Sequence, residues 1–134
     1  MMKDPIYKII TELEKYKYDK DDIEMLNDIN IIDGMINGII IYDEDIVNNI
    51  RRKYQDELQF LSNLEQTLRS FQINENTSSN KSNEQYLLNT RHALVRVQIM
   101  RVLKRKGKEM LEEDLINNDN EYLYNKFVEV MKES

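Results

Sequence analysis

RHALVRVQIMRVLKRKGK, residues 91–108, carries seven Lys or Arg and no acid, in a 134-residue chain whose formal net charge is -6. Its apolar residues recur three and four positions apart, which predicts a helix. The apolar band is wide, because Ala93, Val97 and Met100 extend the face made by Leu94, Val95, Ile99, Val102 and Leu103. So wide a band needs burial on more than one side. The stretch therefore predicts a helix at the centre of a bundle, or one shared with another subunit.

Working outward, this helix is predicted to span about 83–109, with Ser82 and Gln85 in the spacing of a capping box. A second long helix is predicted over about 44–72, from an apolar stripe that steps by three or four: Val47, Ile50, Tyr54, Leu58, Leu61, Leu64, Leu68 and Phe71. Residues 73–84 are rich in Asn and Ser and predict a flexible loop. The two long helices are accordingly expected to be antiparallel.

Shorter helices are predicted at both ends of the chain. Asp4 and Pro5 favour a helix start, and the pattern continues over 5–17. A second short helix is expected from near Asp21 to before a turn at Asp33 and Gly34, and a last helix begins after Asn118 or Asp119. Residues 29–42 are the least helical part; we predict a buried connection there, with a hairpin as the alternative.

The fold prediction is therefore an all-α bundle, arranged as one domain over 1–134. Within it, residues 1–38 form an N-terminal helical segment and residues 39–134 the main bundle. The chain has no Cys, which excludes disulfides and Cys-based zinc sites. No apolar run reaches the roughly 20 residues that span a bilayer, and the start does not resemble a signal peptide. These features favour a cytoplasmic protein without membrane contact, or a nuclear or nucleoid-associated one if its role is in replication.

Charge falls in blocks, and this bears on the basic stretch. Residues 1–50 hold 5 basic and 12 acidic residues, whereas residues 109–134 hold 2 basic and 8 acidic ones. The basic helix can pair with these acids internally, contact a partner protein or a second copy, or contact nucleic-acid phosphates. Internal pairing is the preferred interpretation, and nucleic acid comes last. For the two contact hypotheses the candidate residues are Arg91, Arg101, Lys104, Arg105 and Lys108.

Catalytic and metal-binding patterns are missing from the sequence. The acidic clusters at 19–24 and 43–45 do not follow the ligand spacing of a calcium loop and are better explained as helix caps. His92 is the single histidine, and no nucleophile motif or Gly-rich phosphate loop accompanies it. We therefore expect a non-enzymatic protein with no catalytic residues, no metal and no cofactor.

Three segments resemble a known family. IIIYDEDIVNNIRRKYQDEL (39–58) is similar to the entry and first long helix of the α-helical A domain of GINS subunits. TRHALVRVQIMRVLKRKGKEM (90–110) is similar to its basic central helix, and EEDLINNDNEYLYNKFVEVMKE (112–133) to its acidic linker and closing helix. The resemblance covers about two thirds of the chain and lacks the small β-rich B domain. It implies a DNA replication subunit that pairs with other copies and bridges the MCM helicase to a RecJ-like partner. The alternative is a virus- or lineage-specific helical adaptor or nucleic-acid-binding protein that uses residues 91–108.

Overall fold

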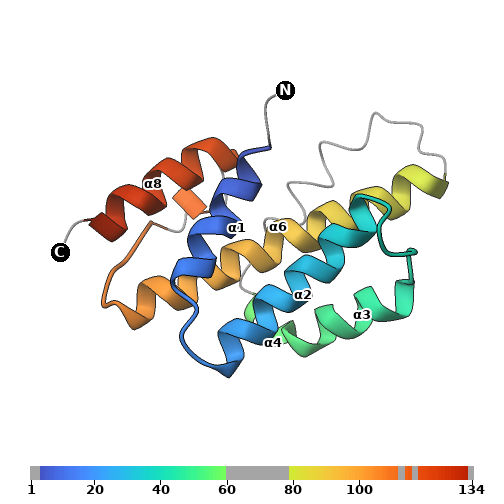
Figure 1. Ribbon diagram of the computed structural model, residues 1–134, viewed down its shortest axis with the longest axis horizontal. Helices are drawn as coiled ribbons and strands as arrows, with labels where there is room; N and C mark the ends of the chain where they lie inside the picture. Colours follow the sequence, from blue (N-terminus) through green and yellow to red (C-terminus); the bar gives the residue numbers. More distant parts are fainter. Residues whose placement is uncertain (1–3, 60–78, 112–113, 116–117, 133–134) are drawn as a thin grey trace. The chain divides into compact units, whose positions relative to one another are not determined.

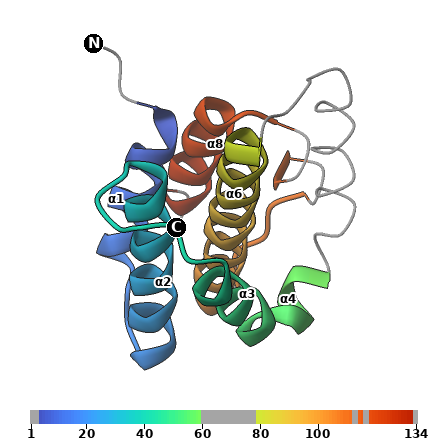
Figure 2. The ribbon, with the colours of Figure 1, turned by 90° about the vertical axis from the view of Figure 1, so that its right-hand side faces the viewer.

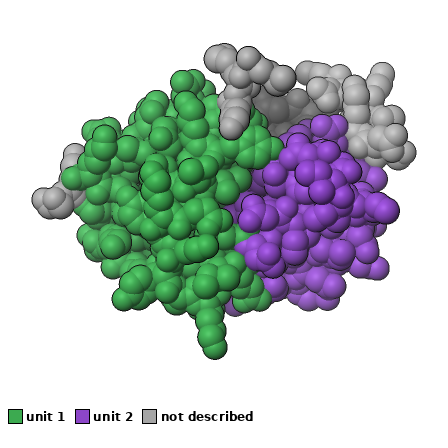
Figure 3. All heavy atoms as spheres, viewed as in Figure 1, with its two compact units in different colours: residues 1–26, 95–134 green, residues 27–94 purple. Residues whose placement is uncertain are grey.

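The computed structural model describes residues 4–59, 79–111, 114–115 and 118–132, and each regular element in these ranges is an α-helix (Figure 1). The all-α prediction is confirmed. The helices are α1 (Pro5–Lys15), α2 (Lys20–Ile36), α3 (Glu44–Lys53), α4 (Gln55–Gln59), α6 (Ser79–Arg105) and α8 (Asn120–Lys132). The chain divides into two compact units, residues 1–26 with 95–134 and residues 27–94, called unit 1 and unit 2 (Figure 3).

Unit 1 contains the two terminal helices predicted from the sequence. Asp4 caps α1 by accepting a hydrogen bond from the backbone N–H of Ile6 at 2.9 Å, and Pro5 occupies the first turn. The buried face of α1 packs against α8, where the ring of Tyr16 meets that of Phe127 edge-on with centroids 5.9 Å apart. The core residues of these two helices are Ile6, Ile9, Ile10, Leu13, Leu123 and Phe127.

In unit 2, the N-terminal part of α6 lies beside α3 (Figure 2). The Tyr86 hydroxyl donates to Asn48 Oδ1 at 2.5 Å, and Arg51 Nη1 donates to Thr90 Oγ1 at 2.7 Å. Residue 86 pairs with residue 48, and residue 90 pairs with residue 51. Because the residue numbers rise together on the two helices, α3 and this part of α6 run in the same direction. The prediction of two long antiparallel helices is therefore confirmed only in part. The helix α6 covers nearly the predicted range. The helix that runs antiparallel to it in unit 2 is α2, whose Asp33 pairs with Arg91.

The helix predicted to start at residue 44 is interrupted at Tyr54. The residue has φ -108° and ψ 20°, and it separates α3 from α4. Its side chain is buried, and its hydroxyl donates to Asp28 Oδ2 at 2.5 Å. The apolar stripe continues through Tyr54 and does not indicate the break. The hydrogen bond that accompanies the break joins Tyr54 to a residue 26 positions away. Residues 60–72 of the prediction lie outside the described residues, as does the 73–78 part of the predicted loop; residues 79–84 belong to α6.

The second helix is longer than predicted, since α2 continues through Gly34 to Ile36. Its buried stripe extends past the predicted end and comprises Met25, Leu26, Ile29, Ile32 and Met35. Gly38, with φ 75°, ends the helix: its N–H donates to Met35 O at 3.3 Å, and the next N–H donates to Gly34 O at 2.8 Å. This is the Schellman arrangement, in which glycine takes the left-handed position.

The prediction of a buried connection at 29–42 is wrong. Its first part is helical, and residues 37–43, here called the 37–43 loop, expose apolar side chains: Ile39 and Ile41 are 82% and 90% exposed. A β-branched apolar run favours burial on average, but the Gly38 cap directs the chain outward immediately after the helix. Of the three isoleucines, Ile40 is the least exposed, at 36%, and its Cδ1 would lie 2.7 Å from a Cβ built on Gly34.

The end of α6 repeats the same cap. Gly107 has φ 66°, its N–H donates to Lys104 O at 3.1 Å, and the Lys108 N–H donates to Leu103 O at 2.8 Å. The helix therefore stops at Arg105, four residues before the predicted end at 109. The positive charges of Lys104 and Arg105 in the last turn lie where the helix dipole favours cations.

Candidate functional site

Two of the five predicted contact residues are engaged inside their own units. Arg91, in unit 2, is 5% exposed, and its Nη1 lies 2.5 Å from Asp33 Oδ1. Arg105, in unit 1, forms a two-point pair with Asp22, with Nη1–Oδ2 at 2.6 Å and Nη2–Oδ1 at 2.9 Å. Acids of the chain itself therefore occupy these two guanidinium groups, as the internal-pairing interpretation expects.

Asp22 is fully buried near the start of α2, and its carboxylate accepts hydrogen bonds from several donors. Burial alone would raise its pKa, but hydrogen bonds from Arg105, from Gln98 Nε2 at 2.8 Å and from the backbone N–H groups of Tyr18 and Asp19 hold that pKa well below its usual range. Asp19 Oδ1 accepts in turn from the Asp22 N–H at 3.0 Å. This reciprocal pattern confirms that the acids at the start of α2 cap the helix.

The other three predicted residues lie in unit 1 and differ in exposure. Lys104 is exposed, whereas Arg101 and Lys108 are half-buried. Exposed Lys106 adds a further cation next to them. The basic surface that remains for an outside partner is therefore the short lysine group at the end of α6, and it is smaller than the seven charges of the sequence suggest.

Sequence reasoning missed Arg96, the largest fully buried side chain among the described residues. Its Nε donates to Leu115 O at 2.6 Å, its Nη2 to Asn118 O at 3.2 Å, and both terminal nitrogens reach Asn120 Oδ1 at 3.3 Å. Burial lowers the pKa of Arg96 to about 9, which leaves it charged at neutral pH. The sequence spacing does indicate this burial. Arg96 precedes core-facing Ile99 by three residues, so the two side chains lie on the same face of the helix. Its role is to hold the chain before α8 against α6.

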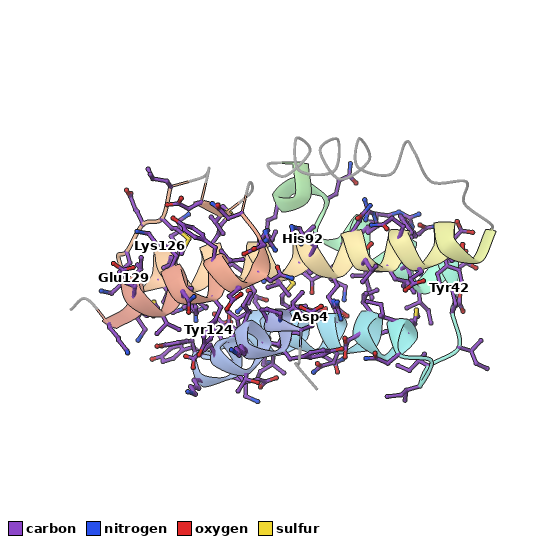
Figure 4. The ribbon with its side chains drawn as sticks, turned by 90° about the horizontal axis from the view of Figure 1, so that it is seen from above. Asp4, Tyr42, His92, Tyr124, Lys126 and Glu129 are labelled. Atoms are coloured by element: carbon purple, nitrogen blue, oxygen red, sulfur yellow. The ribbon has the colours of Figure 1, made fainter. Side chains whose placement is uncertain are left out.

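A pocket of about 300 Å³ opens in unit 2 beside the 37–43 loop. Its lining residues come from the end of α2, the loop and the first turns of α6: Met35, Ile36, Tyr42, Asn83, Glu84 and Leu87. Tyr42, which Figure 4 labels, is the lining residue that the loop supplies. Four of the six lining side chains are largely apolar, while Asn83 and Glu84 are exposed polar residues at the margin. The pocket therefore combines an apolar base, where Met35 and Leu87 are almost fully buried, with a polar margin.

The surroundings of the loop are negatively charged. Residues 27–50 contain five acids and no Lys or Arg. Asp28 and Asp33 pair with Lys53 and Arg91, and the other three acids directly follow the exposed isoleucines. Burial raises the pKa of Tyr42, and the charges of Glu44 and Asp43 add to that effect. Asp43 caps α3, because its Oδ1 accepts from the Asp45 N–H at 3.0 Å. The acids at 43–45 thus serve as a helix cap, as predicted, and they also place negative charge next to exposed isoleucines.

The described residues offer no other assembled chemistry. No three His, Asp or Glu side chains among them are arranged to hold a metal ion. His92 is half-buried on α6 (Figure 4). Within the described ranges no helix has the length and apolar character needed to cross a membrane.

Comparisons with known proteins add no assignment. No family model, no curated protein and no solved structure matches the chain. The exposed isoleucines, their pocket and the acids around them are therefore the basis for a functional proposal.

Proposed function

We propose that this chain is a non-enzymatic helical subunit that binds a partner protein through the 37–43 loop and its pocket. The observation that carries the proposal is the exposure of Ile39 and Ile41, at 82% and 90%, beside a pocket lined by Met35 and Leu87. Large apolar side chains gathered on a surface mark interaction sites, because water contact is unfavourable for them until a partner covers them.

The replication role is a narrower form of the same proposal. It draws on the sequence resemblance to GINS subunits, in which the helices pair with other subunits. A GINS-like chain would bridge a helicase to a further protein, and helicase subunits would be its partners in the native host. Self-association is the remaining form, in which a second copy covers the loop.

The basic end of α6 supports a second candidate function. Lys104 and Lys106 are exposed, and clustered lysines are attracted to nucleic-acid phosphates. Two of the guanidinium groups that would strengthen such a surface are already bound to acids, since Arg91 pairs with Asp33 and Arg105 with Asp22. Protein binding through the loop is therefore the function we favour.

Affinity purification from the native host tests the favoured proposal. Tagged wild type is compared with the double variant Ile39→Ser/Ile41→Ser and with Leu111→Ser, which changes an exposed apolar residue of unit 1. We expect a partner to co-purify with wild type and Leu111→Ser and to be lost from the double variant. Equal recovery with all three chains would refute the proposal. Light scattering on the purified chain identifies self-association, and salt-dependent DNA binding that Lys104→Gln/Lys106→Gln abolishes would support the second candidate.

A further inference from the structure

The surface around the 37–43 loop combines apolar and acidic character within unit 2. Ile46, on the first turn of α3, is 38% exposed and is a further exposed isoleucine that follows Ile39 and Ile41 closely in sequence. Glu44 and Asp45 lie between these isoleucines in sequence, and Glu84 lies at the margin of the pocket. A partner that covers this surface must bury apolar groups and face several carboxylates at once.

Those carboxylates are available to a partner. Among the described residues, no ion pair involves Glu44, Asp45 or Glu84, in contrast to Asp22, Asp28 and Asp33. For Glu44 and Asp45 the nearest basic residues in sequence are in the last turn of α3, where Arg51 lies over the ring of Tyr86 and donates to Thr90. Lys81 precedes Glu84 by three residues. Because opposite potentials match across interfaces, the missing cations are expected on the partner.

The size of the pocket restricts what enters it. At about 300 Å³ it is at the lower end of the range of small-molecule sites. One or two apolar side chains fill such a space, which is how an amphipathic helix anchors itself in a groove. A helix also presents further apolar side chains three and four positions away, and these would cover the isoleucines, while flanking Lys or Arg would face the acids.

We propose that the partner segment is a basic amphipathic helix, whose apolar anchor enters the Met35–Tyr42–Leu87 pocket and whose cations face Glu44, Asp45 and Glu84. This inference rests on the proposed function and names the chemistry of its partner. Anionic lipid headgroups and nucleic-acid phosphates are repelled by the same carboxylates. The apolar loop alone would suit a membrane surface, but its acidic surroundings select a cationic protein segment.

Selection from a library of short random peptides displayed on phage tests this assignment. The full chain is the bait, and Ile41→Ser is the counter-bait, since Ile41 is exposed and its replacement leaves the core intact. Peptides that bind wild type and fail on the variant are sequenced. We expect them to carry an excess of Lys and Arg, with apolar residues three and four positions apart. If no peptide distinguishes the two baits, the loop is not a binding site and the proposed function fails as well.

A synthetic peptide from the selected set then tests the charge contribution. Its affinity should fall about tenfold in the variant Glu44→Gln/Asp45→Asn/Glu84→Gln, and also between about 0.1 M and about 1 M salt, where screening becomes strong. The control Glu109→Gln/Glu121→Gln/Glu129→Gln makes the same change of net charge at exposed acids of unit 1 and should bind as wild type does. This inference fails, while the proposed function stands, if the loop-dependent peptides are neutral or acidic. It fails in the same way if they bind the first triple variant as tightly as wild type. Loop-dependent sedimentation with phosphatidylglycerol vesicles would overturn it in favour of a membrane.

Discussion

The carboxylate of Asp22 and the guanidinium of Arg105 form a two-point ion pair in unit 1, with both N–O distances at or below 2.9 Å. The acid is fully buried, while the Arg105 side chain is 28% exposed. The pair joins the first turns of α2 to the last turn of α6. Arg105, one of the cations at the end of the basic stretch, is thus paired with an acid of the chain itself.

Asp22→Asn is expected to destabilise the protein by about 2 kcal/mol at neutral pH. Breaking a buried pair costs about 3–5 kcal/mol, and the partial exposure of Arg105 reduces that figure. Because the folded pKa of Asp22 lies below its unfolded value of about 3.9, the stabilisation is complete above that value and is lost as pH falls through the folded pKa.

Urea unfolding at a series of pH values checks both parts. The free energy of unfolding of wild type should decline as pH falls below about 4, and Asp22→Asn should lack this part of the decline. Asp21→Asn, at an exposed acid of the same turn, serves as the control and should follow wild type. A variant with unchanged pH dependence would contradict the role given to Asp22.

Arg96→Lys is expected to cost about 2 kcal/mol or more. A lysine cannot reproduce the fork that reaches Leu115 O, Asn118 O and Asn120 Oδ1, so buried carbonyl oxygens would lose their donors. Hydrogen exchange should show reduced protection in α8, whose first residue is Asn120. Lys104→Gln, at an exposed position of the same helix, should change stability by no more than about 0.5 kcal/mol. Equal thermal midpoints for the two variants would refute the clamp role of Arg96.

Tyr54→Phe is expected to destabilise unit 2 by about 1–2 kcal/mol. The change removes the hydroxyl that donates to Asp28 and leaves a buried carboxylate with Lys53 Nζ at 2.9 Å. Chemical denaturation measures the loss. Tyr122→Phe removes a hydroxyl from an exposed tyrosine, which donates to Asp114 at 3.2 Å, and should cost clearly less. A loss no larger than that of the control would show that this buried hydrogen bond contributes no more to stability than an exposed one.

Gly34 and Ile40 are expected to be energetically coupled. Alanine is favoured over glycine inside a helix by about 1 kcal/mol, but a Cβ at Gly34 would lie 2.7 Å from Ile40 Cδ1. Gly34→Ala should therefore stabilise the protein more in an Ile40→Ala background than in wild type. A double-mutant cycle on the free energy of unfolding measures the difference. Additive effects would mean that Ile40 yields freely and that Gly34 is not required for its packing.

Sequence patterns predicted what depends on local spacing. The caps at Asp4 and at the acids before α3 follow from residue type, and α1, α6 and α8 follow from helical periodicity. The break at Tyr54 does not, because a hydrogen bond to Asp28, distant in sequence, accompanies it. The exposed loop was also mispredicted, since composition indicated burial for its isoleucines while the glycine that turns them outward was interpreted as a general sign of irregular structure.

The site shows the same division. Internal pairing of Arg91 and Arg105 was expected from charge blocks, but which acids meet them depends on helix packing. The residues that line the pocket come from three separate segments between positions 35 and 87, and no local sequence pattern predicts that they meet. The burial of Arg96 can be predicted from the sequence, because its place in the helical repeat puts it among core positions. Its charge is the reason that the prediction treated it as a surface residue.

The 37–43 loop also bears on how the chain behaves before any partner arrives. Three successive isoleucines followed by tyrosine have the composition of segments that pair between copies as intermolecular β-structure. Such segments are commonly flanked by charged gatekeeper residues, whose mutual repulsion opposes aggregation. Asp43, Glu44 and Asp45 follow the isoleucines directly. We therefore expect the carboxylates at the start of α3 to oppose aggregation of the chain at high concentration as well.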